Sequence, residues 1–73
     1  MKAIIITKTN TLVEGKFRTI NDYIISLEVP ELQAYKASAL IIEGANVTMY
    51  NDHAHIIIPR SAVQEFKLID ETN

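Results

Sequence analysis

Cysteine is absent from this chain of 73 residues, and glycine and proline occur only twice each. Without cysteine the chain has neither a disulfide framework nor a thiolate zinc site, which are the usual means of stabilising small secreted domains. The low glycine and proline content, together with 48% hydrophobic residues, argues against a flexible or low-complexity tail. We therefore expect a single small domain over residues 1–73, in an intracellular protein.

Long hydrophobic runs are also missing near the N-terminus. The opening segment, MKAIIITKTN, has only four consecutive apolar residues before Thr7 and Lys8. That run is too short for the core of a signal peptide or for a membrane span. We expect a soluble, cytoplasmic protein with no membrane partner.

The net charge of −2 disfavours a protein that grips nucleic-acid backbones without specificity, because such domains are normally basic. The charges are nevertheless unevenly distributed. Residues 1–18 contain four basic side chains against Glu14 alone, whereas residues 37–73 contain five acidic side chains against Arg60 and Lys67. This polarity fits either the steering of a ligand or head-to-tail association of copies, or simply the solvated faces of a dipolar protein.

β-Branched residues are the most abundant class that bears on secondary structure. Twelve isoleucines, four valines and six threonines favour a pleated sheet over helices. Apolar or alternating runs, each bounded by turn residues, predict strands at 3–7, 12–19, 23–29, 39–42, 47–50 and 53–58. The segments 43–46 and 51–52 are expected to be hairpin connections. The sequence thus predicts an all-β domain of five to seven short strands that bends into a small barrel.

Two stretches leave alternatives open. Pro30 and Glu31, followed by apolar residues at three-to-four spacing up to Leu40, suit either a short helix or a loop. Near the C-terminus, Ser61 and Gln64 have the spacing of a capping box and would begin a helix. Alternatively, residues 61–63 form one tight turn and residues 66–69 a closing strand.

Catalytic constellations are missing from the sequence. There is no cysteine nucleophile, no glycine-rich phosphate loop and no pair of carboxylates flanked by histidine at helical spacing. His53 and His55 would share one face of a strand, but no third metal ligand can be assigned, so a polar strand face is the simpler interpretation. We expect a protein that is not an enzyme and has no metal or other cofactor.

The segment 13–28 carries a motif. Gly15, Phe17, Ile20, Asn21, Tyr23 and Leu27 occupy its defining positions. This pattern resembles the first motif of the Sm-like proteins, a family of small β-barrels that includes the Hfq-like RNA chaperones. The resemblance implies a strongly bent small barrel, assembly into rings and binding of single-stranded RNA. It places Gly15 at the bend of a strand, Asn21 as the cap of a turn and Tyr23 on a projecting loop.

The second half of the chain fits the Sm-like pattern in three alternative registers. Residues 42–50 are similar to the second Sm motif, with Glu43 in place of the usual basic residue. Tyr35 and Lys36 lie at about the distance from the first motif where Hfq-like proteins have a Tyr-Lys pair. Residues 59–63 resemble the turn before the last strand.

The resemblance implies a binding site built from both motifs. Tyr23 would stack on a base, and Asn21 and Asn46 would form hydrogen bonds in a uridine-type pocket, with Lys16 and Arg18 supplying positive charge nearby. The first functional interpretation is therefore an oligomeric small β-barrel that binds single-stranded RNA. The alternative is a small regulatory or inhibitory module, of the kind phages and plasmids encode, that meets a protein partner through a strand edge or its acidic face.

Overall fold

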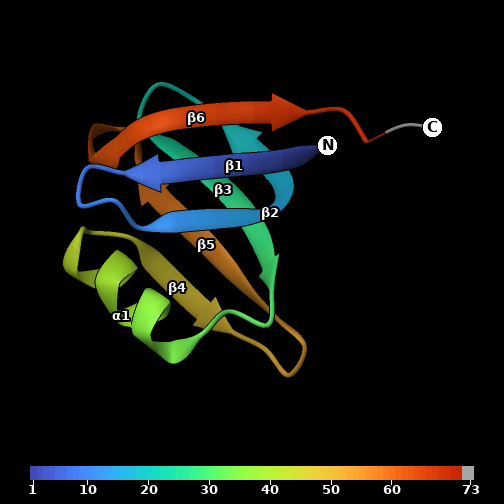
Figure 1. The fold of residues 1–73 in the computed structure, drawn as a ribbon, viewed down its shortest axis with the longest axis vertical. Helices are drawn as coiled ribbons and strands as arrows, with labels where there is room; N and C mark the ends of the chain where they lie inside the picture. Colours follow the sequence, from blue (N-terminus) through green and yellow to red (C-terminus); the bar gives the residue numbers. More distant parts are fainter. Residues whose placement is uncertain (72–73) are drawn as a thin grey trace.

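The computed structural model describes residues 1–71, which form one antiparallel sheet of six strands with a helix at one end (Figure 1). The elements along the chain are β1 (Lys2–Thr7), β2 (Leu12–Ile20), β3 (Ile24–Pro30), α1 (Ala34–Ile42), β4 (Asn46–Met49), β5 (His53–Pro59), η1 (Arg60–Ala62) and β6 (Val63–Ile69). The strands lie in the order β4-β5-β3-β2-β1-β6. The predicted small, mostly β fold with one short helix is confirmed.

Strand β2 bends at Gly15. Its first half pairs with β1 up to Lys16, and from Lys16 onward it pairs with β3. A Cβ atom at Gly15 would lie only 2.1 Å from the carbonyl oxygen of Glu28. Because β3 approaches this closely, no side chain fits at position 15, and the predicted glycine-dependent bend is confirmed.

A β-bulge strengthens the bend. The register between β2 and β3 shifts between Phe17 and Thr19, so that Arg18 lies in the bulge. The sheet is therefore strongly bent and barrel-like, but it is not closed. In the part of the chain that the structure describes, β3 and β4 occupy the two edges of β5, and no ladder joins β4 to β6.

The hydrophobic core lies on the inner face of the bent sheet. Alternate residues of β3 and β5 point into it, and Leu27, Ile56 and Ile58 are almost fully buried. Helix α1 contributes Leu40, which is 0% exposed. Figure 1 shows α1 beside β4, on the side away from β5, and contacts join the two elements. The helix thus covers one margin of the sheet, which is a common way to protect an edge strand.

The predicted strand at 39–42 is wrong, because these residues form the last turns of α1. The N–H of Gly44 donates to the carbonyl of Ile41 (3.0 Å), and the N–H of Ala45 donates to the carbonyl of Leu40 (2.9 Å). Gly44 has a φ of +96°, so the two bonds form a Schellman cap, in which a left-handed glycine ends the helix. The segment 43–46 is therefore a helix-to-strand connection rather than the expected β-hairpin.

Two further connections, the one at 51–52 and the one before β6, agree with predictions made from the sequence. The predicted hairpin at 51–52 is confirmed, since the N–H of Tyr50 donates to the carbonyl of His53 at 2.8 Å. Near the C-terminus, the alternative of one tight turn followed by a closing strand is the correct one. None of the helical segments in residues 1–71 combines the length and the apolar character that a bilayer crossing requires.

Candidate functional site

The turn between β2 and β3 holds an exposed aromatic ring on a well-bonded backbone. The side-chain Oδ1 of Asn21 accepts hydrogen bonds from the N–H groups of Tyr23 (2.8 Å) and Ile24 (2.9 Å). Asparagine commonly stabilises turns in this way. Tyr23 is 80% exposed. The turn therefore fixes the backbone of Tyr23 while its ring stands in solvent, and the Nδ2 group of Asn21 remains as a donor for a ligand.

Arg60 joins this turn from the other end of the chain. Its Nη1 donates to the carbonyl oxygen of Asn21 at 2.8 Å, and its backbone N–H donates to the carbonyl of Tyr23 at 2.9 Å. Sequence reasoning did not assign Arg60 to the site. The feature of the sequence that could have identified Arg60 was its position in residues 59–63, which resemble the turn before the last strand of the Sm-like pattern. Of the three registers considered for the second half of the chain, this is the one with hydrogen bonds to the β2–β3 turn.

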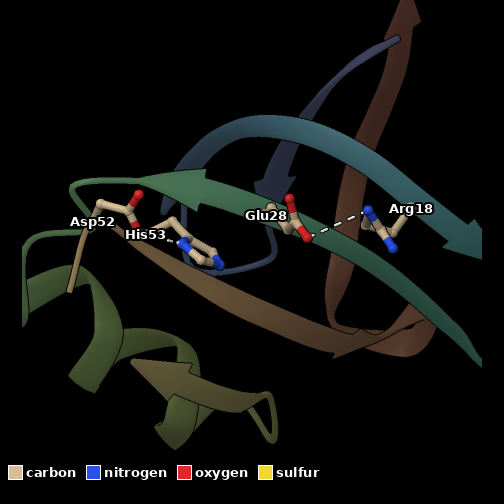
Figure 2. A network of polar contacts seen from close by, with 4 residues as sticks. All are labelled: Arg18, Glu28, Asp52 and His53. Atoms are coloured by element: carbon tan, nitrogen blue, oxygen red, sulfur yellow. Dashed lines mark hydrogen bonds and ion pairs between the residues drawn. The ribbon is translucent and has the colours of Figure 1, made fainter. Parts of the chain in front are cut away.

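Positive side chains continue from the turn along β2. Arg18 Nη1 lies 3.4 Å from Glu28 Oε1, and Figure 2 shows this ion pair across the face of β3. Lys16 lies directly opposite Lys2 on β1 and opposite Glu28 on β3. Two lysines facing each other across a ladder repel one another, and the neighbouring carboxylates of Glu14 and Glu28 offset this repulsion.

The carboxylates among these cations are only loosely engaged. Lys2 Nζ lies 3.5 Å from Glu14 Oε2, and both side chains are partly exposed. Exposed ion pairs of this kind contribute little free energy, so a competing anion can displace them. The outer face of β1 and β2 thus presents Lys2, Lys16 and Arg18 as cations that can exchange their partners.

A hollow of about 600 Å³ lies on the same outer face, beside the bend of β2. Its lining residues are Met1, Lys2, Glu14, Gly15, Lys16, Glu28, Pro30, His53 and Glu71. Both positive and negative side chains line it, so it does not select a strongly charged ligand of either sign by itself.

His53 is fixed by its own hairpin. Its Nδ1 lies 2.6 Å from Asp52 Oδ1 (Figure 2), and its ring stacks on Tyr50 with the centroids 4.7 Å apart. The hydrogen bond to His53, followed by a backbone hydrogen bond and the charge of His53, lowers the pKa of Asp52. Within residues 1–71 no three potential ligands cluster as a metal site would require. His53 and His55 belong to the partly buried outer face of β5.

The structure brings together only part of the predicted site. Asn21 and Tyr23 share the turn, and Lys16 and Arg18 lie on the strand that leads into it. Asn46, in contrast, begins β4 and pairs with Ile57, so β5 and β3 separate it from β2. The second-motif register that suggested Asn46 spans the end of α1 and the start of β4.

Comparison of the chain with known protein families, with curated proteins and with solved structures finds no match. The resemblance to Sm-like proteins therefore stays a prediction, and a function has to be argued from the chemistry of these residues.

Proposed function

We propose that this protein is a non-enzymatic module that binds single-stranded RNA at the β2–β3 turn. The observation that supports the proposal most is the turn itself, in which hydrogen bonds from Arg60 to the carbonyl groups of Asn21 and Tyr23 hold the backbone that carries an exposed tyrosine ring. An aromatic side chain can stack on any base, and a neighbouring arginine can contact the phosphate that follows it. Because the hydrogen bonds of Asn21 and Arg60 already order the backbone, binding loses little conformational entropy there.

Lys16 and Arg18 extend this site along β2 and would track the RNA backbone away from the stacked base. To bind a phosphate, Arg18 must give up its ion pair with Glu28, and Lys16 must bind beside the negative charge of Glu28. Both effects limit the affinity that phosphate contacts can supply. If three or four phosphates are neutralised, the logarithm of the affinity should fall with the logarithm of salt concentration with a slope of about −2 to −3. We therefore expect moderate affinity at low salt rather than indiscriminate tight binding.

The test is binding of a short, labelled, uridine-rich RNA measured by fluorescence anisotropy at low salt. Tyr23→Ala should weaken binding by about 1 to 3 kcal/mol, the value of one stacked base. Tyr23→Phe should bind nearly as well as the natural chain, because the ring face is retained. Tyr50→Ala is the matched control, since Tyr50 is also an exposed tyrosine but lies in the β4–β5 hairpin, at the opposite end of β5 from Arg60. Failure of the natural chain to bind at low salt would exclude the proposal.

A second candidate function is a regulatory or inhibitory protein-interaction module, and the free edge of β6 favours it. In the described residues β6 pairs only with β1, and Glu65 and Glu71 add exposed negative charge near that edge. An extended segment of a partner could add to such an edge as a further strand. Capture of a partner by the tagged protein should then resist nuclease and should weaken when Glu65 and Glu71 are replaced by lysine. Capture that nuclease abolishes would refute this alternative.

We also propose that the protein acts as a homo-oligomer in the cytoplasm. A domain of this size buries only roughly 60 to 65% of the surface of its unfolded chain, so association adds burial that the monomer lacks. The native mass, measured with and without nuclease, tests the oligomer independently of bound RNA.

A further inference from the structure

The outward face of α1 is apolar. Ile42 is 85% exposed, Tyr35 is 68% exposed and Ile41 is 56% exposed, although all three belong to a regular helix. Tyr35 and Ile42 lie seven residues apart, and this spacing places them on one side of the helix. Leu40 points the opposite way, into the core. The helix is therefore apolar on both sides, a pattern typical of a helix that is covered on both sides.

Charge is missing from this face as well. Lys36 is the one charged residue between Ala34 and Ile42, and it is half-buried, toward the side that contacts the domain. On the side of the helix that carries Tyr35 and Ile42, the positions between them hold the small residues Ser38, which is exposed, and Ala39, which is half-buried. The exposed Ile41 is turned about 100° round the helix from Ile42 and flanks this side. An acidic or basic partner would find no complementary charge here, so an occupant of this face must itself be uncharged and apolar.

We propose that a second copy of this chain covers the face, with the two α1 helices packed antiparallel about a two-fold axis. The layout of the face is self-complementary about the midpoint between Ser38 and Ala39. An antiparallel pairing places Tyr35 of each copy against Ile42 of the other and brings the small residues together at the crossing. A two-fold interface requires such a self-complementary patch, and small residues at the centre permit close approach of the helices.

The size of the face sets the strength of the dimer. From their exposed fractions, the side chains of Tyr35 and Ile42 offer on the order of 200 to 300 Å² per copy. A standard interface buries about 800 Å² per partner, so this pairing should be weak and reversible. We expect a dissociation constant between about 10 μM and 1 mM.

This proposal is independent of RNA binding, because the two surfaces are separated. Figure 1 places the β2–β3 turn at the top of the view and α1 at the bottom. Failure of one proposal therefore leaves the other intact, and the two are distinguished by examining nuclease-treated protein.

The first experiment is sedimentation of nuclease-treated protein from about 5 μM to 1 mM. The natural chain should pass from monomer to dimer, and Ile42→Ser should raise the dissociation constant by at least about tenfold. Because Ile42 is exposed, this variant should keep its fold, which circular dichroism verifies. Ile69→Ser, the matched control at an exposed isoleucine of β6, should dimerise as the natural chain does. A monomer throughout the range, or a dimer lost with Ile69→Ser and kept with Ile42→Ser, would overturn the proposal.

The second experiment uses the absence of cysteine from the chain. A Ser38→Cys variant places one thiol at the expected crossing of the two helices and should form a disulfide-linked dimer under mild oxidation. Ser61→Cys, on the exposed turn η1, is the control and should remain mostly monomeric. Equal cross-linking of both variants, or none at position 38, would contradict the antiparallel helix pair.

Discussion

Replacement of Gly15 by alanine tests the bend on which the whole sheet depends. The added Cβ would lie 2.1 Å from the carbonyl oxygen of Glu28, 2.9 Å from its carbonyl carbon and 3.0 Å from Val29 Cγ2. The first two contacts are with backbone, which cannot move away by changing a rotamer. Strand β3 must therefore separate from β2 near the Lys16–Glu28 pair.

The expected cost follows from two contributions. Overpacking of a tight site costs about 1 to 3 kcal/mol, and weakening of one or two ladder hydrogen bonds adds roughly 1 kcal/mol each. A total of about 2 to 5 kcal/mol is a large share of the roughly 4 to 11 kcal/mol expected for a domain of this length. Gly15→Ala should therefore unfold at a much lower urea concentration than the natural chain at 25 °C.

Gly44→Ala is the matched comparison, because its cost has a different origin. Gly44 has a φ of +96°, and a Cβ there would meet only Pro59 Cγ, at an ordinary 3.5 Å. The substitution costs the strain of a left-handed alanine, roughly 1 to 2 kcal/mol. Urea unfolding followed by circular dichroism gives both values, provided that the slope m is unchanged. If Gly15→Ala proved no more destabilising than Gly44→Ala, the steric account of the bend would be wrong.

Two further predictions concern exposed polar contacts. Arg60→Ala removes the hydrogen bond to the carbonyl of Asn21 and should lower the free energy of unfolding by about 0.5 to 1.5 kcal/mol. Amide exchange at Tyr23 and Ile24 should become faster, and unchanged exchange would show that the turn does not need the guanidinium. The pKa of Asp52 is lowered in the folded state, so its contribution to stability is present above the ordinary aspartate pKa and is lost as the pH falls below it. The stability difference between the natural chain and Asp52→Asn should therefore shrink in acid, and a difference independent of pH would contradict this.

Most strands were predictable because their sequences alternate or end at unambiguous residues. The bend at Gly15 and the end of β3 at Pro30 follow from the missing Cβ and the missing N–H of those residues. Helix α1 was harder, since the apolar run 39–42 and the following Gly44 suit a hairpin as well as a capped helix. The burial of Leu40 against the sheet decides between them, and this tertiary contact has no local signature.

The residues of the candidate site likewise divide into those that local sequence predicts and one that depends on a tertiary contact. Asn21 and Tyr23 were predictable because their turn is local in sequence, and the bonds from Asn21 Oδ1 span only two and three residues. Arg60 lies 39 residues from Asn21 along the chain. It reaches the turn only because β3 and β5 pair in the register that sets Ile24 opposite Pro59. A contact that depends on strand register across the sheet cannot be read from the spacing of residues.

The pairing of β1 with β6 has a consequence for how the chain is made. Lys2 lies opposite Ile69, so the start of the first strand and the end of the last are neighbours. During synthesis β1 can acquire its hairpin partner β2 early, but its other edge waits until residues 63–69 have been made. Contacts so distant along the chain slow folding, because a long loop must close before they form. Removal of residues 63–69 would accordingly leave β1, the first strand to be synthesised among those described, with an unpaired edge.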